Sequence, residues 1–141
     1  MRYSEGYKYI TRAREVYRCL HVVPGVGAAI YTDGGRLVAQ LSASGVLTIE
    51  ERYAYDGASG PTIDTRNSMR GSLYHDVFFE MMRAGVLDRK WFDAANQELR
   101  DVCRADGMST YRSWLWYKCV GTKVAYQSTL AKNAPAIITA P

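Results

Sequence analysis

The hydrophobic pattern changes its period near the middle of the chain, and this change constrains the fold more than any other feature. Before residue 56, short apolar stretches alternate with turn signals, such as Pro-Gly at 24–25 and Asp-Gly-Gly at 33–35. After residue 67, large apolar residues recur every four positions, namely Met69, Leu73, Val77 and Met81. Such spacing is typical of a helix with one core-facing side. The chain is therefore predicted to be α+β, an N-terminal antiparallel sheet packed beside about three C-terminal helices.

Strands are expected at residues 28–31, 36–42 and 46–55. The last two are rich in Val, Leu, Ile and Tyr and are separated by a short Ser/Ala/Gly segment, which predicts a hairpin with Leu47, Ile49 and Tyr53 on one face. Residues 3–23 fit both helical spacing and strand alternation, and we favour a strand there.

Three helices are expected in the second half. The first covers residues 68–84, is capped by Asn67 or Ser68, and ends at Gly85. The second follows Asp88 and stops at Gly107, and the third runs from about Ser109 to about Gly121. Because only four or five residues join the first two helices, they should lie antiparallel.

Length and composition favour one domain at residues 1–132, followed by an extended tail at 133–141 rich in Pro, Ala and Ile. Of the 141 residues, 48% are hydrophobic and 23% charged, enough to bury a core. No stretch has the roughly 20 apolar residues of a membrane span, and the first residues lack the apolar run of a signal peptide. Three widely spaced cysteines favour idle thiols in a reducing compartment.

Charge is distributed unevenly along the chain. Residues 53–107 hold seven basic and nine acidic residues, whereas residues 108–141 hold four basic and no acidic residues. Carboxylates gathered in the middle fit a site that handles protons or a cation better than one that grips phosphate. Four cations in the last segment and a pI near 9.0 give no strong nucleic-acid signal.

The candidate site lies in this acidic middle segment. Antiparallel packing can bring Asp93 of the second helix near His75 of the first, where the carboxylate would hold the imidazole as a base. Asp76 points about 100° away from His75 and is better placed to face the loop at residues 57–60. A carboxylate and loop oxygens form a hard site for calcium, which predicts a metal site from Asp76, Gly57, Ser59 and Gly60.

This arrangement resembles the secreted calcium-dependent phospholipases that cleave the sn-2 ester. These enzymes combine a glycine-rich calcium loop, a helix carrying His-Asp, and an antiparallel helix whose Asp supports the His. The resemblance implies that His75 activates water, Asp76 binds calcium with carbonyls of residues 57–60, and Asp93 supports His75. The chain lacks the family's Y-G-C-x-G-x-G-G loop, its disulfides and its signal peptide.

A longer resemblance covers residues 50–120. The string Tyr-Asp-Gly-Ala-Ser-Gly-Pro at 55–61, the Leu-Tyr-His-Asp at 73–76 and the Asp-bearing helix after them are similar to a phage and prophage family known as domain of unknown function 1353. Tyr55 replaces the family's usual Trp, and Phe79 its usual Tyr. The resemblance implies a viral origin and supplies no established activity.

Structural alternatives stand beside these assignments. His75 and Asp76 can simply tether the glycine loop, Asp93 can be a solvated helix residue, and residues 56–61 can be only a turn. Ser59 as a nucleophile with His75 lacks the spacing of a nucleophile elbow. A metal-dependent phosphohydrolase would need His21 as a further ligand.

Residues 111–118 mix aromatic and cationic side chains. They fit nucleic-acid stacking or a membrane interface. The favoured interpretation is structural: a third helix that places Trp114 and Tyr117 in the core and leaves Trp116 partly exposed.

Two functions follow from the sequence. The leading one is a phage-encoded, calcium-assisted ester hydrolase with a phospholipase-like His-Asp site, acting on lipid or envelope. The alternative is a non-catalytic phage virion or assembly protein that keeps the scaffold and binds other virion proteins, with the tail from Asn133 as a docking arm. Either protein would be found in the host cytoplasm during infection or in the virion.

Overall fold

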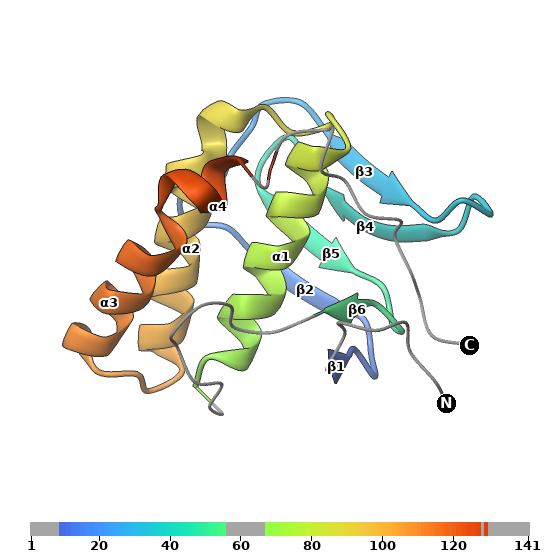
Figure 1. The fold of residues 1–141 in the computed structure, drawn as a ribbon. Helices are drawn as coiled ribbons and strands as arrows, with labels where there is room; N and C mark the ends of the chain where they lie inside the picture. Colours follow the sequence, from blue (N-terminus) through green and yellow to red (C-terminus); the bar gives the residue numbers. More distant parts are fainter. Residues whose placement is uncertain (1–8, 56–66, 128, 130–141) are drawn as a thin grey trace.

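The computed structural model describes residues 9–55, 67–127 and 129, and within them the fold is α+β, as predicted (Figure 1). A four-stranded antiparallel sheet has the order β2-β5-β4-β3, and β1 pairs with β6 in a separate two-stranded sheet. The strands are β1 (Tyr9–Ile10), β2 (Glu15–Arg18), β3 (Ala28–Tyr31), β4 (Leu37–Leu41), β5 (Val46–Ile49) and β6 (Ala54–Tyr55).

The three expected helices are present as α1 (Met69–Arg83), α2 (Phe92–Ala105) and α3 (Thr110–Val120). A 3-10 turn, η1 (Arg89–Trp91), precedes α2, and a short α4 (Lys123–Gln127), which was not predicted, follows α3. Helix α1 packs against both the sheet and α2, and α3 packs on the other side of α2, so the helices extend outward from the sheet (Figure 1). None of the described helices combines the length and apolar character needed to cross a membrane. The tail at 133–141 lies outside the described residues.

Local chemistry explains the helix boundaries. The Asp88 carboxylate accepts the backbone N–H of Lys90 at the start of η1, and the Ser109 hydroxyl accepts that of Arg112 at the start of α3. Gly85 and Gly107 follow α1 and α2 with φ of 76° and 102°, a conformation that glycine adopts without steric cost.

The predicted strand at 46–55 is interrupted by a turn. β5 ends at Ile49, and Arg52 adopts a φ of 69°. The Thr11 hydroxyl donates to the carbonyl of Glu50 and accepts the N–H of Tyr53, which fixes the turn from outside. The chain therefore leaves the main sheet and continues as β6 beside β1.

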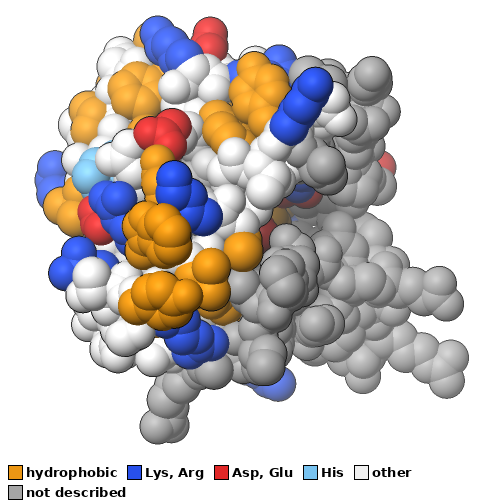
Figure 2. Space-filling view, turned by 60° about the vertical axis from the view of Figure 1, so that its left-hand side comes forward, with side chains coloured by type: hydrophobic (Ala, Val, Ile, Leu, Met, Phe, Trp, Pro, Cys, Tyr) orange, Lys and Arg blue, Asp and Glu red, His pale blue; other side chains and the backbone are white. Residues whose placement is uncertain are grey.

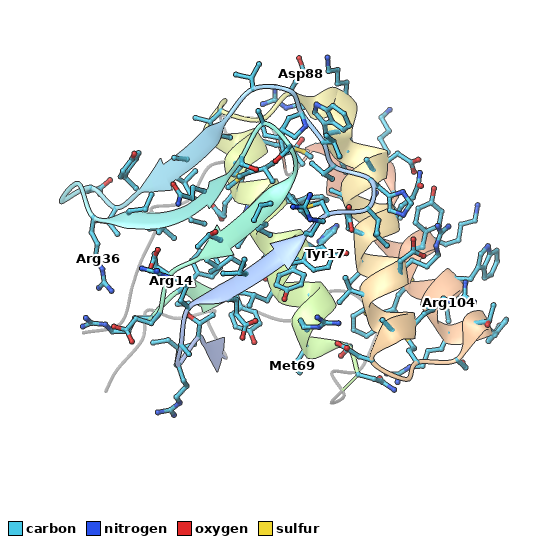
Figure 3. The ribbon with its side chains drawn as sticks, turned by 180° about the vertical axis from the view of Figure 1, so that it is seen from behind. Arg14, Tyr17, Arg36, Met69, Asp88 and Arg104 are labelled. Carbon is cyan, nitrogen blue, oxygen red and sulfur yellow. The ribbon has the colours of Figure 1, made fainter. Side chains whose placement is uncertain are left out.

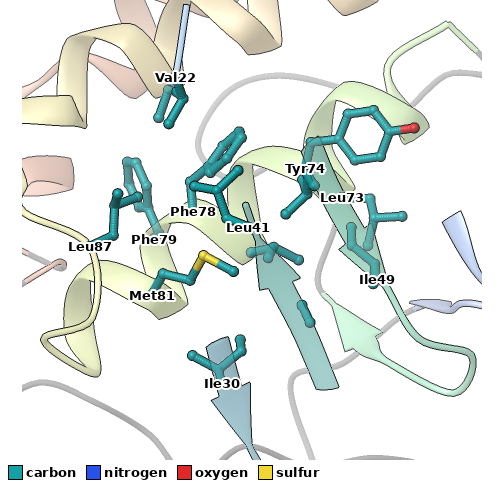
Figure 4. Close-up of a cluster of buried hydrophobic side chains, with 14 of the residues drawn as sticks. Val22, Ile30, Leu41, Ile49, Leu73, Tyr74, Phe78, Phe79, Met81 and Leu87 are labelled. Atoms are coloured by element: carbon teal, nitrogen blue, oxygen red, sulfur yellow. The ribbon is translucent and has the colours of Figure 1, made fainter. Parts of the chain in front are cut away.

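One face of the main sheet supplies half of the core. Cross-strand neighbours form two rows on this face, Tyr17–Leu47–Leu41–Ala28 and Glu15–Ile49–Ala39–Ile30. Helix α1 covers them with Leu73, Val77 and Met81, three buried members of the predicted stripe, whereas the fourth, Met69, is partly buried. Figure 4 shows Leu73 and Met81 in this cluster. The opposite face carries exposed residues such as Val16 and Tyr31, which is common for an antiparallel sheet packed on one side.

Gly71 sets how closely α1 and α2 approach. A Cβ at this position would lie 2.7 Å from Sγ of Cys103 and 3.0 Å from Cδ1 of Leu99. The absence of a side chain therefore lets the α2 surface contact the α1 backbone. One turn further along α1, the same contact places His75 against Asn96 of α2.

Candidate functional site

The imidazole of His75 lies inside the contact between α1 and α2. The residue is only 7% exposed, and its Nε2 lies 2.7 Å from Oδ1 of Asn96. An amide oxygen can only accept, so Nε2 carries the proton and donates to Asn96. The ring also packs against Phe79, with centroids 4.0 Å apart. His75 is thus a buried, neutral hydrogen-bond donor between two helices.

Burial lowers the pKa of His75 to about 4, because the charged imidazolium would lose its hydration. The hydrogen bond to Asn96 opposes this shift, and the positive charge of Arg83 adds to it. An amide oxygen supports an imidazolium less than a carboxylate would. The group is therefore a weak base that stays unprotonated near neutral pH.

The predicted pairing of Asp93 with His75 is wrong. Asp93 is exposed, and its carboxylate accepts hydrogen bonds from the Tyr117 hydroxyl at 2.5 Å and from the Gln97 amide at 2.6 Å. At about 100° per residue, Asp93 lies about 120° around α2 from the buried Leu99. Asn96 shares the buried side of the helix and takes the place beside His75.

The structure tests only one member of the predicted calcium site. Asp76 is half-buried on α1, whereas Gly57, Ser59 and Gly60 lie outside the described residues, as does Asp56. In the parts of the chain that are described, no three His, Cys, Asp or Glu side chains come together in a way that could hold a metal ion. A calcium site at Asp76 and the loop stays a prediction.

A second polar cluster, which the sequence analysis missed, surrounds Glu98. This side chain is fully buried on α2, yet it accepts the Tyr17 hydroxyl at 2.6 Å and the backbone N–H groups of His21 and Val22 at 2.5 and 3.0 Å. Figure 3 shows Tyr17 between β2 and the helices. The available signal was a Glu at a core position of α2, one residue before Leu99. Glu98 thus anchors the segment after β2 to the helical layer.

His21 lies beside this cluster and does not join His75. Its Nε2 lies 2.5 Å from a carboxylate oxygen of Asp101, which also accepts from Arg100. Burial alone would raise the pKa of Asp101, but the hydrogen bonds from His21 and Arg100 outweigh it and hold that pKa below its usual value. His21 therefore belongs to an ion-pair cluster on α2, and the geometry does not combine it with His75 and Asp76 as metal ligands.

The two buried thiols, Cys19 and Cys103, are poor nucleophiles. Burial raises the pKa of Cys19 and of Cys103 to about 12, so both remain protonated at neutral pH. Neither thiol is part of a disulfide.

Helix α3 is rotated relative to the prediction. Trp116 is buried, with 3% of its surface exposed, whereas Trp114 is 47% exposed. The buried side of α3 is formed by Ser113 and Trp116, and Trp114 lies about 160° around the helix from Trp116. The expectation of a buried Trp114 and a partly exposed Trp116 is therefore wrong.

Comparison of the chain with models of known protein families, with curated proteins and with solved structures finds no match.

Proposed function

We propose that this chain is a non-catalytic phage virion or assembly protein, in which His75 joins two helices rather than activating water. The phage origin rests on the sequence resemblance. The observation that carries the choice between the two predicted functions is the environment of His75. A general base must reach the proton that it removes and needs a pKa near the working pH. His75 is buried, donates to Asn96, and has a pKa of about 4.

The position of Asp93 supports the same choice. A hydrolase of the phospholipase type needs a carboxylate that orients the histidine and stabilises its protonated form. Here the residue at the imidazole is an amide, and the Asp93 carboxylate binds Tyr117 and Gln97 instead. The polar pair is better suited to fixing the distance and register of α1 and α2.

Three variants separate a structural pair from a catalytic one. His75→Ala should lower the free energy of unfolding by about 2–4 kcal/mol, because it leaves a cavity and removes the partner of a buried amide. Asp93→Asn changes an exposed side chain and should cost less than about 0.5 kcal/mol. Asp76→Asn removes the carboxylate of the predicted calcium ligand. Because the proposal involves no calcium site, calcium should change the melting temperature of neither this variant nor the wild type.

The activity assay uses the unmodified chain with phospholipid vesicles and short-chain esters, with calcium and with a chelator. We expect no calcium-dependent hydrolysis above the rate of His75→Ala. Hydrolysis that His75→Ala abolishes without loss of stability would contradict the proposal and favour the ester hydrolase. In the phage that encodes the chain, a stop codon in its gene should block particle formation while genome replication continues.

A further inference from the structure

We infer that the exposed side of α3 binds single-stranded nucleic acid, with Tyr111 and Trp114 as stacking platforms. This inference goes beyond the proposed function and rests on a different part of the molecule. Tyr111 is 72% exposed and Trp114 47% exposed, although both are large aromatic residues. Leu115 and Lys118 continue the same exposed stripe along α3.

The two rings lie next to each other on α3. Their centroids lie 6.3 Å apart, with an angle of 31° between the ring planes. The two rings thus form one continuous aromatic surface. Every base has a π-face that can stack on such rings whatever its sequence. The rings therefore fit a strand that lies along the helix.

A cationic side chain lies over one of the two rings. Nζ of Lys118 lies 5.7 Å from the centre of the Trp114 ring. Arg104 at the end of α2 and Lys123 in α4 are exposed, and neither forms an ion pair within the described part of the chain. Figure 2, turned towards the α3 side, shows hydrophobic side chains interspersed with those of Lys and Arg, and some Asp and Glu side chains among them.

Two of the three neighbouring acids are paired with cations. Asp101 pairs with Arg100 and Asp106 with Arg70, whereas Asp93 accepts hydrogen bonds from the neutral side chains of Tyr117 and Gln97 and keeps its negative charge. The sequence from residue 107 onward contains no acidic residue. The exposed side of α3 thus presents two aromatic rings and the Lys118 cation to solvent, a combination that is complementary to a polyanion with flat bases.

A membrane surface is less well matched by the same residues. A helix that lies in the interface buries a broad apolar face and keeps its cations on the opposite side. On α3, Lys118 lies within the exposed stripe, directly over Trp114, and Leu115 is the only exposed aliphatic residue of the stripe. The rings and the charges share one surface, as a nucleic-acid strand requires.

The test measures binding of fluorescein-labelled oligothymidylate of about 16 nucleotides, the upper end of common site sizes, by fluorescence anisotropy. Trp114→Ala and Tyr111→Ala should each weaken binding by roughly fivefold to 150-fold, while Trp114→Phe retains most of it. The matched control is Tyr31→Ala, which removes a 54% exposed ring from β3 and should leave affinity unchanged. Circular dichroism checks that each variant is folded.

Salt dependence gives a second, independent measurement. Lys118→Gln should reduce the slope of log affinity against log salt concentration by about 0.7, since one phosphate contact is lost. Arg18→Gln removes the same charge from the exposed side of β2 and should not change the slope. Equal binding by wild type and Trp114→Ala would overturn the inference. Binding to phosphatidylglycerol vesicles without binding to the oligonucleotide would also overturn it and identify a lipid surface.

Discussion

The side chain of Glu98 accepts the backbone N–H of His21, 77 positions earlier in the sequence, at 2.5 Å. The same oxygen accepts the N–H of Val22, and the other oxygen accepts the Tyr17 hydroxyl. A turn of backbone that leaves the sheet would otherwise bury two donors without acceptors, which is costly. The Glu98 side chain therefore accepts the two backbone N–H groups that follow β2 and joins this segment to the helices.

Replacement of Glu98 should be among the most destabilising single changes in the chain. Glu98→Leu leaves the N–H groups of the half-buried His21 and the buried Val22 without their acceptor, and at about 1–3 kcal/mol each we expect a loss of about 2–6 kcal/mol in urea unfolding. Glu98→Gln keeps an oxygen for both N–H groups and should cost less. Tyr17→Phe removes one donor only and should cost about 1 kcal/mol. A loss below 1 kcal/mol for Glu98→Leu would mean that the turn does not depend on this anchor.

The pKa of His75 predicts acid sensitivity. Its folded pKa of about 4 lies below the unfolded value of about 6.5, so the unfolded chain binds more protons between these two values. The free energy of unfolding should therefore be largest above pH 6.5 and should fall as the pH drops towards 4, by on the order of 3 kcal/mol. His75→Gln lacks the titrating imidazole, so its free energy of unfolding should not show this fall. Parallel pH profiles of urea unfolding for both proteins check it, and identical profiles would contradict the assigned environment.

Asn96→Asp should change the chemistry of the same pair. The amide Nδ2 of Asn96 is buried and has no hydrogen-bond partner within the described residues, so a second oxygen there loses no bond. A carboxylate beside the imidazole favours the protonated form. We expect the pKa of His75 to rise well above 4, measured by NMR titration of the ring protons. Asn96→Ala serves as the control and should keep the pKa low. An unchanged pKa in Asn96→Asp would argue against direct contact.

Gly71→Ala tests the close contact of α1 and α2. Alanine favours helix by about 1 kcal/mol over glycine, but its Cβ would lie 2.7 Å from Sγ of Cys103. We expect overpacking to dominate, with a net loss of about 1–3 kcal/mol in thermal or urea unfolding. Adding Cys103→Ala should recover part of that loss, since it removes the nearest atom. A Gly71→Ala protein as stable as the wild type would indicate that the helices move apart without cost.

The fold class and most element positions could be predicted from the sequence, because they depend on local periodicity and capping. The four-residue spacing of Leu73, Val77 and Met81 predicts both the helix and its buried side, and Asp88 predicts the start of the second helical segment. The turn at Arg52 was missed because its cause is Thr11, about forty residues away.

The candidate site depended on tertiary structure. The sequence indicates that the two helices lie antiparallel, but only their packing decides which α2 residue meets His75. The close contact at Gly71 and the rotation of α2 place Asn96 there and direct Asp93 to Tyr117. The exposure of Trp114 was likewise decided by which side of α3 packs on α2, since aromatic residues occur on both sides of that helix. Local sequence determines that a helix forms, whereas its rotation depends on contacts with residues distant in the chain.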